Sequence, residues 1–267
     1  MRTAVVTGIS SPLGLGIAQR LRERGFIIIG TSRRRVSALE SLPGFRIFHC
    51  DFMDRSTVEE AAGEIARACA GSTSVWFVNA AGASALTSLE DADRQIYDLN
   101  NVNFVVPVSL AHALLPLIRK SAGRILWLGS QSSRLCAPLL GGYGASKAAL
   151  RAYSEVLDLE LVHFGARSIY AELGNVRTGL HNRVLAEARV SSNSPYARLY
   201  EAAPELSARM LRHAMDVDKA VSRLVALLER ENPKPVVAVG RDAAVRALIG
   251  RLSPSAFRML VRWRLDW

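Results

Sequence analysis

Residues 3–21 read TAVVTGISSPLGLGIAQRL, and this stretch decides the fold. It opens on an apolar run, residues 3–7, that is typical of a fully buried strand in a parallel sheet. A glycine-bearing turn follows, and the residues from Ile17 onward predict a helix. This order of strand, glycine turn and helix favours a dinucleotide site. Glycines let the backbone approach a pyrophosphate, and the N-terminus of the helix offers free amides.

Six further runs predict strands. They cover residues 26–31, 46–49, 75–78, 125–128, 168–173 and 235–239. Helical patterns lie over residues 56–70, 91–119, 143–164 and 218–229. Strands that alternate with helices are typical of a parallel sheet. We therefore predict an α/β protein built on a Rossmann-type, doubly wound, parallel seven-stranded sheet with helices on both faces.

The chain of 267 residues, 49% of them hydrophobic, is suited to a single domain, residues 1–267, with a full core. Residues 179–218 show no strand pattern and combine a turn-rich break with apolar and aromatic residues. We interpret them as a mobile cap over the binding site, which favours a bulky hydrophobic substrate. Residues 241–267 form a basic C-terminal extension with helical spacing.

The formal net charge of +10 comes mostly from arginine. Such a balance is found in proteins that bind nucleic acid or anionic membranes, but also on solvated surfaces that suit a phosphate-rich cofactor. Because no nucleic-acid motif is present, we predict no nucleic-acid partner. Cys50, Cys69 and Cys136 have neither metal-ligand nor disulfide spacing, so we expect no metal site. With no signal peptide and no apolar stretch long enough to span a bilayer, we expect a cytoplasmic protein.

A second informative stretch runs over residues 123–147. It contains Gly-Arg-Ile-Leu-Trp-Leu-Gly-Ser, a loop, and Tyr-Gly-Ala-Ser-Lys. Tyr143 and Lys147 are four residues apart, which places the phenol and the ammonium on one helix face. A nearby ammonium favours the phenolate, so we expect the phenol to become a better acid–base group. Ser130 follows a predicted strand, thirteen residues before Tyr143, and can fold back over that helix face.

Ser130, Tyr143 and Lys147 at this spacing resemble the active-site signature of the short-chain dehydrogenase/reductase family. The resemblance covers most of residues 1–178 and implies an oxidoreductase that moves hydride between a nicotinamide and a carbonyl or secondary alcohol. It implies that Tyr143 gives the proton, that Ser130 binds the oxygen and that Lys147 holds the ribose. It also implies a catalytic Asn that helps to hold a water; the register from Pro116 favours Asn103 over Asn100.

The resemblance also implies the cofactor contacts. They are Gly8, Ser10, Ser11, Leu13, Gly14, Ser32, Arg33, Asp51, Phe52, Asn79, Ala80, Gly82, Tyr143, Lys147, Gly174, Val176 and Thr178. Three positions depart from the family pattern, namely Pro12, Ala80 and Leu173. These departures motivate an alternative, a non-catalytic NADPH-binding or scaffold protein on the same fold.

The end of the second predicted strand indicates which cofactor is preferred. Enzymes that prefer NAD usually place an acidic residue there to bind the ribose 2′-hydroxyl, and here the position holds Ser32, followed by Arg33. No carboxylate repels a 2′-phosphate, and a guanidinium can pair with it. We therefore predict NADP(H).

Two further expectations concern partners. In the family, helices matching residues 91–119 and 143–164 commonly form a subunit interface, so we expect a homodimer or homotetramer, although their apolar residues could equally belong to the core. In the C-terminal tail, one helix face would carry Ala256, Leu260, Trp263 and Trp267, and another Arg251, Arg258 and Arg262. That pattern is compatible with weak contact at a membrane surface, or with packing on the protein's own domain or on a partner subunit.

Overall fold

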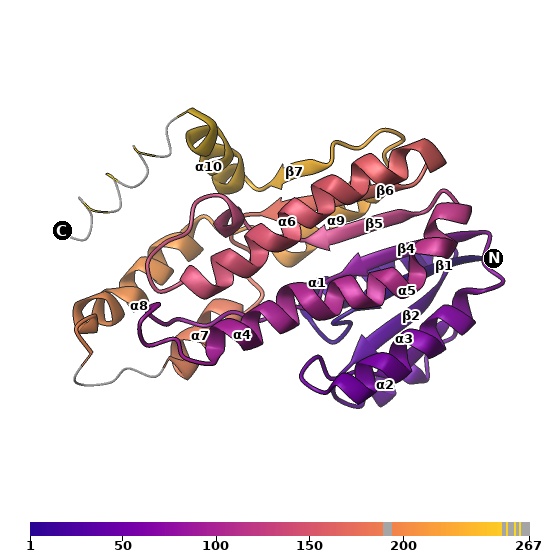
Figure 1. The fold of residues 1–267 in the computed structure, drawn as a ribbon, viewed down its shortest axis with the longest axis horizontal. Helices are drawn as coiled ribbons and strands as arrows, with labels where there is room; N and C mark the ends of the chain where they lie inside the picture. The colour runs from indigo at the N-terminus through magenta and orange to yellow at the C-terminus, as the bar shows by residue number, and fades with distance from the viewer. Residues whose placement is uncertain (189–193, 253–254, 256–258, 260–261, 263–267) are drawn as a thin grey trace.

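The computed structural model describes residues 1–188, 194–252, 255, 259 and 262. Its seven strands form one parallel sheet in the order β3-β2-β1-β4-β5-β6-β7, so the predicted Rossmann-type architecture is confirmed (Figure 1). The strands are β1 (Arg2–Thr7), β2 (Phe26–Ser32), β3 (Phe45–His49), β4 (Ser74–Asn79), β5 (Arg124–Leu128), β6 (Arg167–Leu173) and β7 (Val236–Val239).

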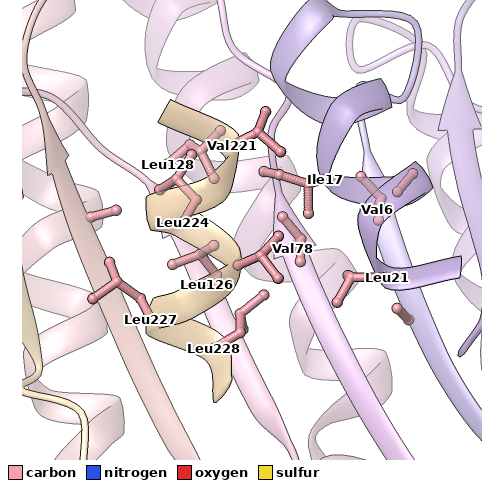
Figure 2. Close-up of a cluster of buried hydrophobic side chains, with 14 of the residues drawn as sticks. Val6, Ile17, Leu21, Val78, Leu126, Leu128, Val221, Leu224, Leu227 and Leu228 are labelled. Carbon is pink, nitrogen blue, oxygen red and sulfur yellow. The ribbon is translucent and has the colours of Figure 1, made fainter. Parts of the chain in front are cut away.

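Successive side chains of each strand enter opposite cores, because side chains alternate along a strand. Val6, Val78 and Leu126 lie in one core, with residues of α1 (Pro12–Glu23) and α9 (Val217–Glu229), as Figure 2 shows. The neighbouring strand residues, among them Val5 and Phe77, lie in the other core, with α3 (Arg55–Cys69), α5 (Val106–Lys120) and α6 (Gly141–Leu161). Burial on both faces explains why the strands read as continuous apolar runs.

The helix after the glycine turn begins five residues earlier than predicted, at Pro12 rather than Ile17. Ser11 caps it, and its Oγ accepts a hydrogen bond from the Gly14 amide at 3.1 Å. Proline is well suited to the first helical position, because its missing N–H would have no intrahelical partner there. The N-terminus of α1 is therefore preserved despite the proline.

The long helix predicted over residues 91–119 begins at Gln95 and has three parts. They are α4 (Gln95–Asn100), a π-helical turn (Asn101–Val105) and α5. The helix cannot start earlier because Asp93 has a positive φ of 35°. By length and composition, residues 95–120 could cross a membrane, so the expectation that no stretch qualifies is wrong. In this fold, however, Leu110 and Leu114 are buried in the core of the sheet.

The smaller elements gather at the ends of the sheet. Figure 1 shows α7 (Leu180–Glu187) and α8 (Ala197–Arg212) beside α4, at the carboxyl ends of the strands, with the N-terminus at the opposite end. The helix α2 (Ser37–Glu40) follows β2, 3₁₀ turns cover Gln131–Ser133 and Val162–Phe164, and α10 (Arg241–Leu252) follows β7. The apolar face predicted for the tail, residues 256, 260, 263 and 267, lies outside the described residues.

Candidate active site

Tyr143 and Lys147 lie in the first turns of α6, which begins at the carboxyl end of β5. The Lys147 ammonium is 5.9 Å from the centre of the Tyr143 ring and donates a hydrogen bond to the Leu128 carbonyl at 3.0 Å. Only 4% of Lys147 is exposed. Because burial penalises a charge, it lowers the pKa of Lys147 to about 8. The helix spacing thus brings the two groups together as predicted.

The phenol of Tyr143 differs from the expectation. Burial raises its pKa above the ordinary value of 10, and the weaker effect of a hydrogen bond with Ser130 lowers it. Lys147 is buried too, and its own charge is disfavoured, so it does not dominate the phenol. The prediction of a more acidic phenol is therefore wrong for this structure. Tyr143 stays protonated at neutral pH and can serve as an acid.

Ser130 follows β5 and is nearly buried, with 8% exposed. Its Oγ accepts a hydrogen bond from the Ser132 amide at 3.1 Å and caps the 3₁₀ turn Gln131–Ser133. The side chain of Ser130 forms a hydrogen bond with the phenol of Tyr143. The chain after β5 therefore folds back over the face of α6 that carries Tyr143, as predicted. Leu128, two residues earlier, holds Lys147, and the end of β5 therefore touches both members of the helix pair.

Asn103 is fully buried in the π-helical turn, and its side chain clamps the loop after β4. Its Nδ2 donates to the carbonyl of Ala83 at 2.9 Å and to the hydroxyl of Ser146 at 2.9 Å, while its Oδ1 accepts from the Ala83 amide at 2.8 Å. A Cβ added to Gly82 would lie 3.2 Å from Asn103 Oδ1 and 3.4 Å from Lys147 Nζ. The side chains of Asn103 and Lys147 therefore both lie close to Gly82.

Among the described residues, the side chain of the competing Asn100 bonds within its own helix, to the carbonyl of Ile96 at 2.8 Å. Asn101 has a role that the sequence analysis missed, since its Nδ2 donates to the carbonyl of Phe52 at 2.6 Å. Asn101 and Asn103 lie in the π-helical turn and contact different neighbours, whereas Asn100 ends α4. Asn103 is the one that reaches α6, through the hydroxyl of Ser146.

The glycine turn is tightly packed and suits a close backbone approach. Gly8 has a φ of +62°, and a Cβ there would lie 2.7 Å from Ala81 Cα. A Cβ at Gly14 would collide with the Gly8 carbonyl. Ser10 is exposed at the same turn, and Leu13 is half-buried in the first turn of α1. The turn thus presents the N-terminus of α1, whose free amides favour a phosphate group.

Asn79 and Ala80 lie at the end of β4, beside that turn. Thr7 donates to Asn79 Oδ1 at 2.7 Å, and its own oxygen accepts from the Ala81 amide at 3.1 Å. Among the described residues, Asn79 Nδ2 is buried without a hydrogen-bond partner. A buried donor without a partner is costly, and a cofactor oxygen would satisfy it. Together with the glycine turn, this orphaned donor makes the residues present a fit for a nicotinamide dinucleotide.

The end of β2 carries the predicted 2′-phosphate site. Ser32 is buried, and its Oγ accepts from the Arg34 amide at 3.2 Å. Arg33 and Arg34 are exposed, whereas Arg35 has a carboxylate partner, Glu40, at 3.8 Å. Within the described part of the chain, no ion pair engages Arg33 or Arg34. Their guanidinium groups are available to an anion.

Asp51 and Phe52 follow β3 and are both held in place. Asp51 donates its amide to Thr57 Oγ1 at 3.0 Å, and its Oδ1 accepts from the Met53 amide at 3.0 Å. The Phe52 carbonyl is the acceptor of the Asn101 bond. These hydrogen bonds fix the backbone of the two predicted cofactor contacts, Asp51 and Phe52.

The loop after β6 is fixed by a residue that the sequence analysis did not single out, Asp242 of α10. Its Oδ2 accepts from the amide of Asn175 at 2.7 Å and from Asn175 Nδ2 at 2.9 Å. Gly174 is required there, because a Cβ would collide with the same carboxylate. Val176 is buried and bridges to Met215, and Thr178 Oγ1 accepts from the Leu180 amide at 3.4 Å. The sequence gives no spacing signal for Asp242.

The helices α7 and α8, which belong to the region predicted to form a cap, contact the loop before α4. Asp91 Oδ2 accepts from Ser194 Oγ at 2.8 Å and from Tyr200 OH at 3.2 Å. A small apolar cluster joins the two sides; its members are Leu139, Leu199, Tyr200 and Ala203, with Leu86, Leu185 and Tyr196 against them. A cavity of about 270 Å³ lies at the start of α7, lined by Arg177, Gly179, His181, Asn182 and Leu211. The region over the carboxyl ends of the strands is thus partly apolar.

Comparison with known proteins agrees with this geometry. The short chain dehydrogenase family matches residues 2–189. A 3-ketodihydrosphingosine reductase of Bacteroides thetaiotaomicron is 30% identical over 235 residues, which are 86% of this chain and 84% of that protein. An NADPH-dependent 3-dehydrocapnine reductase of Ornithobacterium rhinotracheale is 27% identical over 213 residues, 75% of this chain and 74% of that protein.

Two further proteins are similar to this chain, one in sequence and one in structure. A short-chain dehydrogenase of Penicillium ochrochloron is 33% identical over 184 residues, and the chain spans 66% of its length. The crystal structure of a short-chain dehydrogenase from Streptomyces avermitilis superimposes with a TM-score of 0.80 at 26% identity, covering 99% of this chain and 97% of that one. Since the family pattern, the fold and the grouping of Ser130, Tyr143 and Lys147 agree, the chain belongs to the short-chain dehydrogenase family of oxidoreductases.

Proposed function

We propose that this protein is an NADPH-dependent ketoreductase that acts on the carbonyl, or the corresponding secondary alcohol, of a bulky hydrophobic substrate. The observation that carries the proposal is the grouping of Tyr143, which is half-buried, with the buried residues Ser130 and Lys147. The phenol of Tyr143 is protonated at neutral pH and can therefore serve as the acid that reduction of a carbonyl requires.

The residues divide the work as follows. When bound, NADPH supplies the hydride. Tyr143 gives its proton to the carbonyl oxygen, and the Ser130 hydroxyl donates a hydrogen bond to the same oxygen. Lys147, with a pKa of about 8, stabilises the tyrosinate that is left and holds the nicotinamide ribose. Asn103 fixes the Ala83 backbone beside Lys147, where a water can return the proton from solvent.

The choice of NADPH over NADH rests on Arg33. Replacing Arg33 by alanine is expected to weaken NADPH binding about 10- to 100-fold, because a charge-assisted hydrogen bond contributes about 1.5–3 kcal/mol. NADH binding should not change, since NADH has no 2′-phosphate. Fluorescence titration of both cofactors measures the effect. Arg35→Ala is the matched control, because Arg35 is paired with Glu40 on the same loop. Equal losses for NADPH and NADH would refute the assignment.

The substrate class rests on the cap and on the relatives. The cavity lined by Arg177, His181 and Asn182 suits a polar group. Leu211 of α8 also lines it, and the same helix carries the buried apolar residues Leu199 and Tyr200. The relative from Bacteroides is named for a keto substrate with a sphingoid base, and that from Ornithobacterium for 3-dehydrocapnine and NADPH. We propose a long-chain ketone with a polar head. A panel of such ketones, with NADPH oxidation followed by absorbance, tests this.

We propose further that the protein is a homodimer or homotetramer. Large apolar side chains are exposed between α4 and the 3₁₀ turn that follows α6; they are Tyr97, Val105, Val156, Leu159, Val162 and Phe164. Exposed apolar side chains that gather into a patch are typical of an interface. Light scattering after size-exclusion chromatography should give a multiple of 29.1 kDa. Leu159→Glu should shift the protein toward the monomer, whereas Leu248→Glu, on exposed α10, should not. A wild-type monomer would contradict this.

A further inference from the structure

One face of β6 carries three buried polar residues at every second position. Ser168, Tyr170 and Glu172 are at most 1% exposed. Alternate residues of a strand point to the same side, so the three share the side of the sheet that faces α6. The inner strands of a buried parallel sheet are normally apolar. Three polar residues in this position therefore require hydrogen-bond partners.

Ser168 and Glu172, the outer two of these residues, hold the elements around the candidate active site in place. Ser168 Oγ accepts from the indole nitrogen of Trp127 at 2.9 Å and lies 2.9 Å from Ser154 Oγ of α6. Glu172 pairs with Arg134 at 3.3 Å, in the loop that follows Ser130, and this pair is almost buried, with side-chain exposures of 1% and 15%. One end of the face thus holds α6 against β5, and the other holds the loop after β5.

Tyr170, in the middle, contacts the catalytic group itself. Its hydroxyl accepts a hydrogen bond from the Ser130 amide at 3.1 Å and donates one to the Lys147 carbonyl at 3.1 Å. One oxygen atom therefore joins the backbones of two residues that come from different elements. Burial raises the pKa of the Tyr170 phenol, so the hydroxyl keeps the proton that it donates.

The ring of Tyr170 is packed so tightly that it holds the hydroxyl in place. It is fully buried, and a Cβ added to Gly129 would collide with it. Gly129 therefore lies directly against the ring, which forms the wall on which the chain passes from β5 to Ser130. Hydroxyl and ring together fix where Ser130 leaves the sheet relative to the first turns of α6.

We propose that Tyr170 is a positioning residue of the active site, which sets the distance between Ser130 and the Tyr143–Lys147 helix through its hydroxyl. The proposal rests on the function proposed above and adds a residue that does not touch the reacting atoms. Such positioning affects the rate strongly, because a displacement of about 1 Å in a catalytic group can lower the rate about 100-fold.

The test compares two tyrosines that each lose only a hydroxyl. Tyr170→Phe keeps the ring against Gly129 and removes both hydrogen bonds. Tyr153→Phe is the matched control. Tyr153 lies in the same core, with its ring centre 5.8 Å from that of Trp127, and among the described residues its hydroxyl is buried without a partner.

Two readouts are expected to move in Tyr170→Phe and to stay unchanged in Tyr153→Phe. The Ser130 amide should exchange faster with deuterium, because it loses its acceptor. kcat for ketone reduction should fall about 10- to 100-fold while the NADPH Kd is kept, which a general loss of structure would not produce.

The outcomes separate this proposal from the proposed function. If the wild type reduces no ketone, the proposed function fails, and the amide exchange of Ser130 alone decides whether Tyr170 positions it. Faster exchange with a lower kcat in Tyr170→Phe alone supports the proposal. Unchanged exchange, an unchanged kcat in an active enzyme, or an equal loss in Tyr153→Phe would overturn it.

Discussion

Replacing Tyr143 by phenylalanine is expected to lower kcat for ketone reduction about 10³-fold and to leave NADPH binding within about twofold of the wild type. The hydroxyl is the only group removed, and it is the proton donor in the proposed mechanism. Burial keeps that proton in place at neutral pH by raising the pKa of the phenol. Without it, the oxyanion that forms on the substrate has no acid within reach.

The measurement is the steady-state rate of NADPH oxidation, alongside a fluorescence titration of NADPH. Tyr97→Phe serves as the control, because Tyr97 is 76% exposed and its hydroxyl is on the surface. A Tyr143→Phe protein that turns over at more than a tenth of the wild-type rate would show that another group supplies the proton. A loss of NADPH binding in the same variant would mean that the phenol holds the cofactor instead.

Replacing Lys147 by methionine is expected to abolish turnover and to stabilise the fold at pH 7. The pKa of Lys147 falls from 10.5, its value in an unfolded chain, to about 8 in the folded protein. The unfolded state therefore binds more protons between these two pH values, and stability rises with pH across that window. Below pH 8 the buried charge costs about 3 kcal/mol, at 1.36 kcal/mol per pKa unit.

Methionine removes that cost but also removes the hydrogen bond to the Leu128 carbonyl, which contributes about 1 kcal/mol. A net gain of about 2 kcal/mol at pH 7 is expected, and it should shrink as the pH approaches 10.5. Urea unfolding at several pH values measures it. Lys219→Met, at an exposed position of α9, is the control. A Lys147→Met protein that is less stable at pH 7, or that keeps turning over, would contradict the account.

Much of the fold could be predicted from short-range patterns. Burial on both faces gave each strand a continuous apolar run, and Gly8 marked the first turn. Helix starts were less predictable, because they depend on single residues. Pro12 could open α1 five residues before Ile17, and the positive φ of Asp93 delayed α4 to Gln95.

The site was predictable where residues are local in sequence and not where they are distant. The spacing of Tyr143 and Lys147 already placed both groups on one helix face. Tyr170 and Asp242 reach the site only after the sheet brings β6 and α10 beside β5, and no spacing in the sequence marks them. The direction of the Tyr143 pKa was wrong for a related reason, because burial is a property of the whole fold.

The three departures from the family pattern can now be placed in the structure. Pro12 occupies the first position of α1, where it costs no hydrogen bond. Ala80 follows Asn79, which still bonds with Thr7, and Leu173 ends β6 with its side chain in the core. The residues at these three positions are compatible with the proposed cofactor site. Measuring turnover of a ketone with NADPH decides between the ketoreductase and the non-catalytic alternative.

The most direct measurement follows a deuterium atom from cofactor to product. The purified protein would be incubated with NADPH that carries deuterium at nicotinamide C4, one molecule for each stereochemical position, and with a long-chain ketone. Mass spectrometry of the alcohol should show one deuterium on the carbinol carbon from a single C4 position, and almost none with Tyr143→Phe. A protein that binds NADPH yet transfers no deuterium to any ketone of the panel beyond the Tyr143→Phe level would contradict the ketoreductase account and favour the non-catalytic alternative.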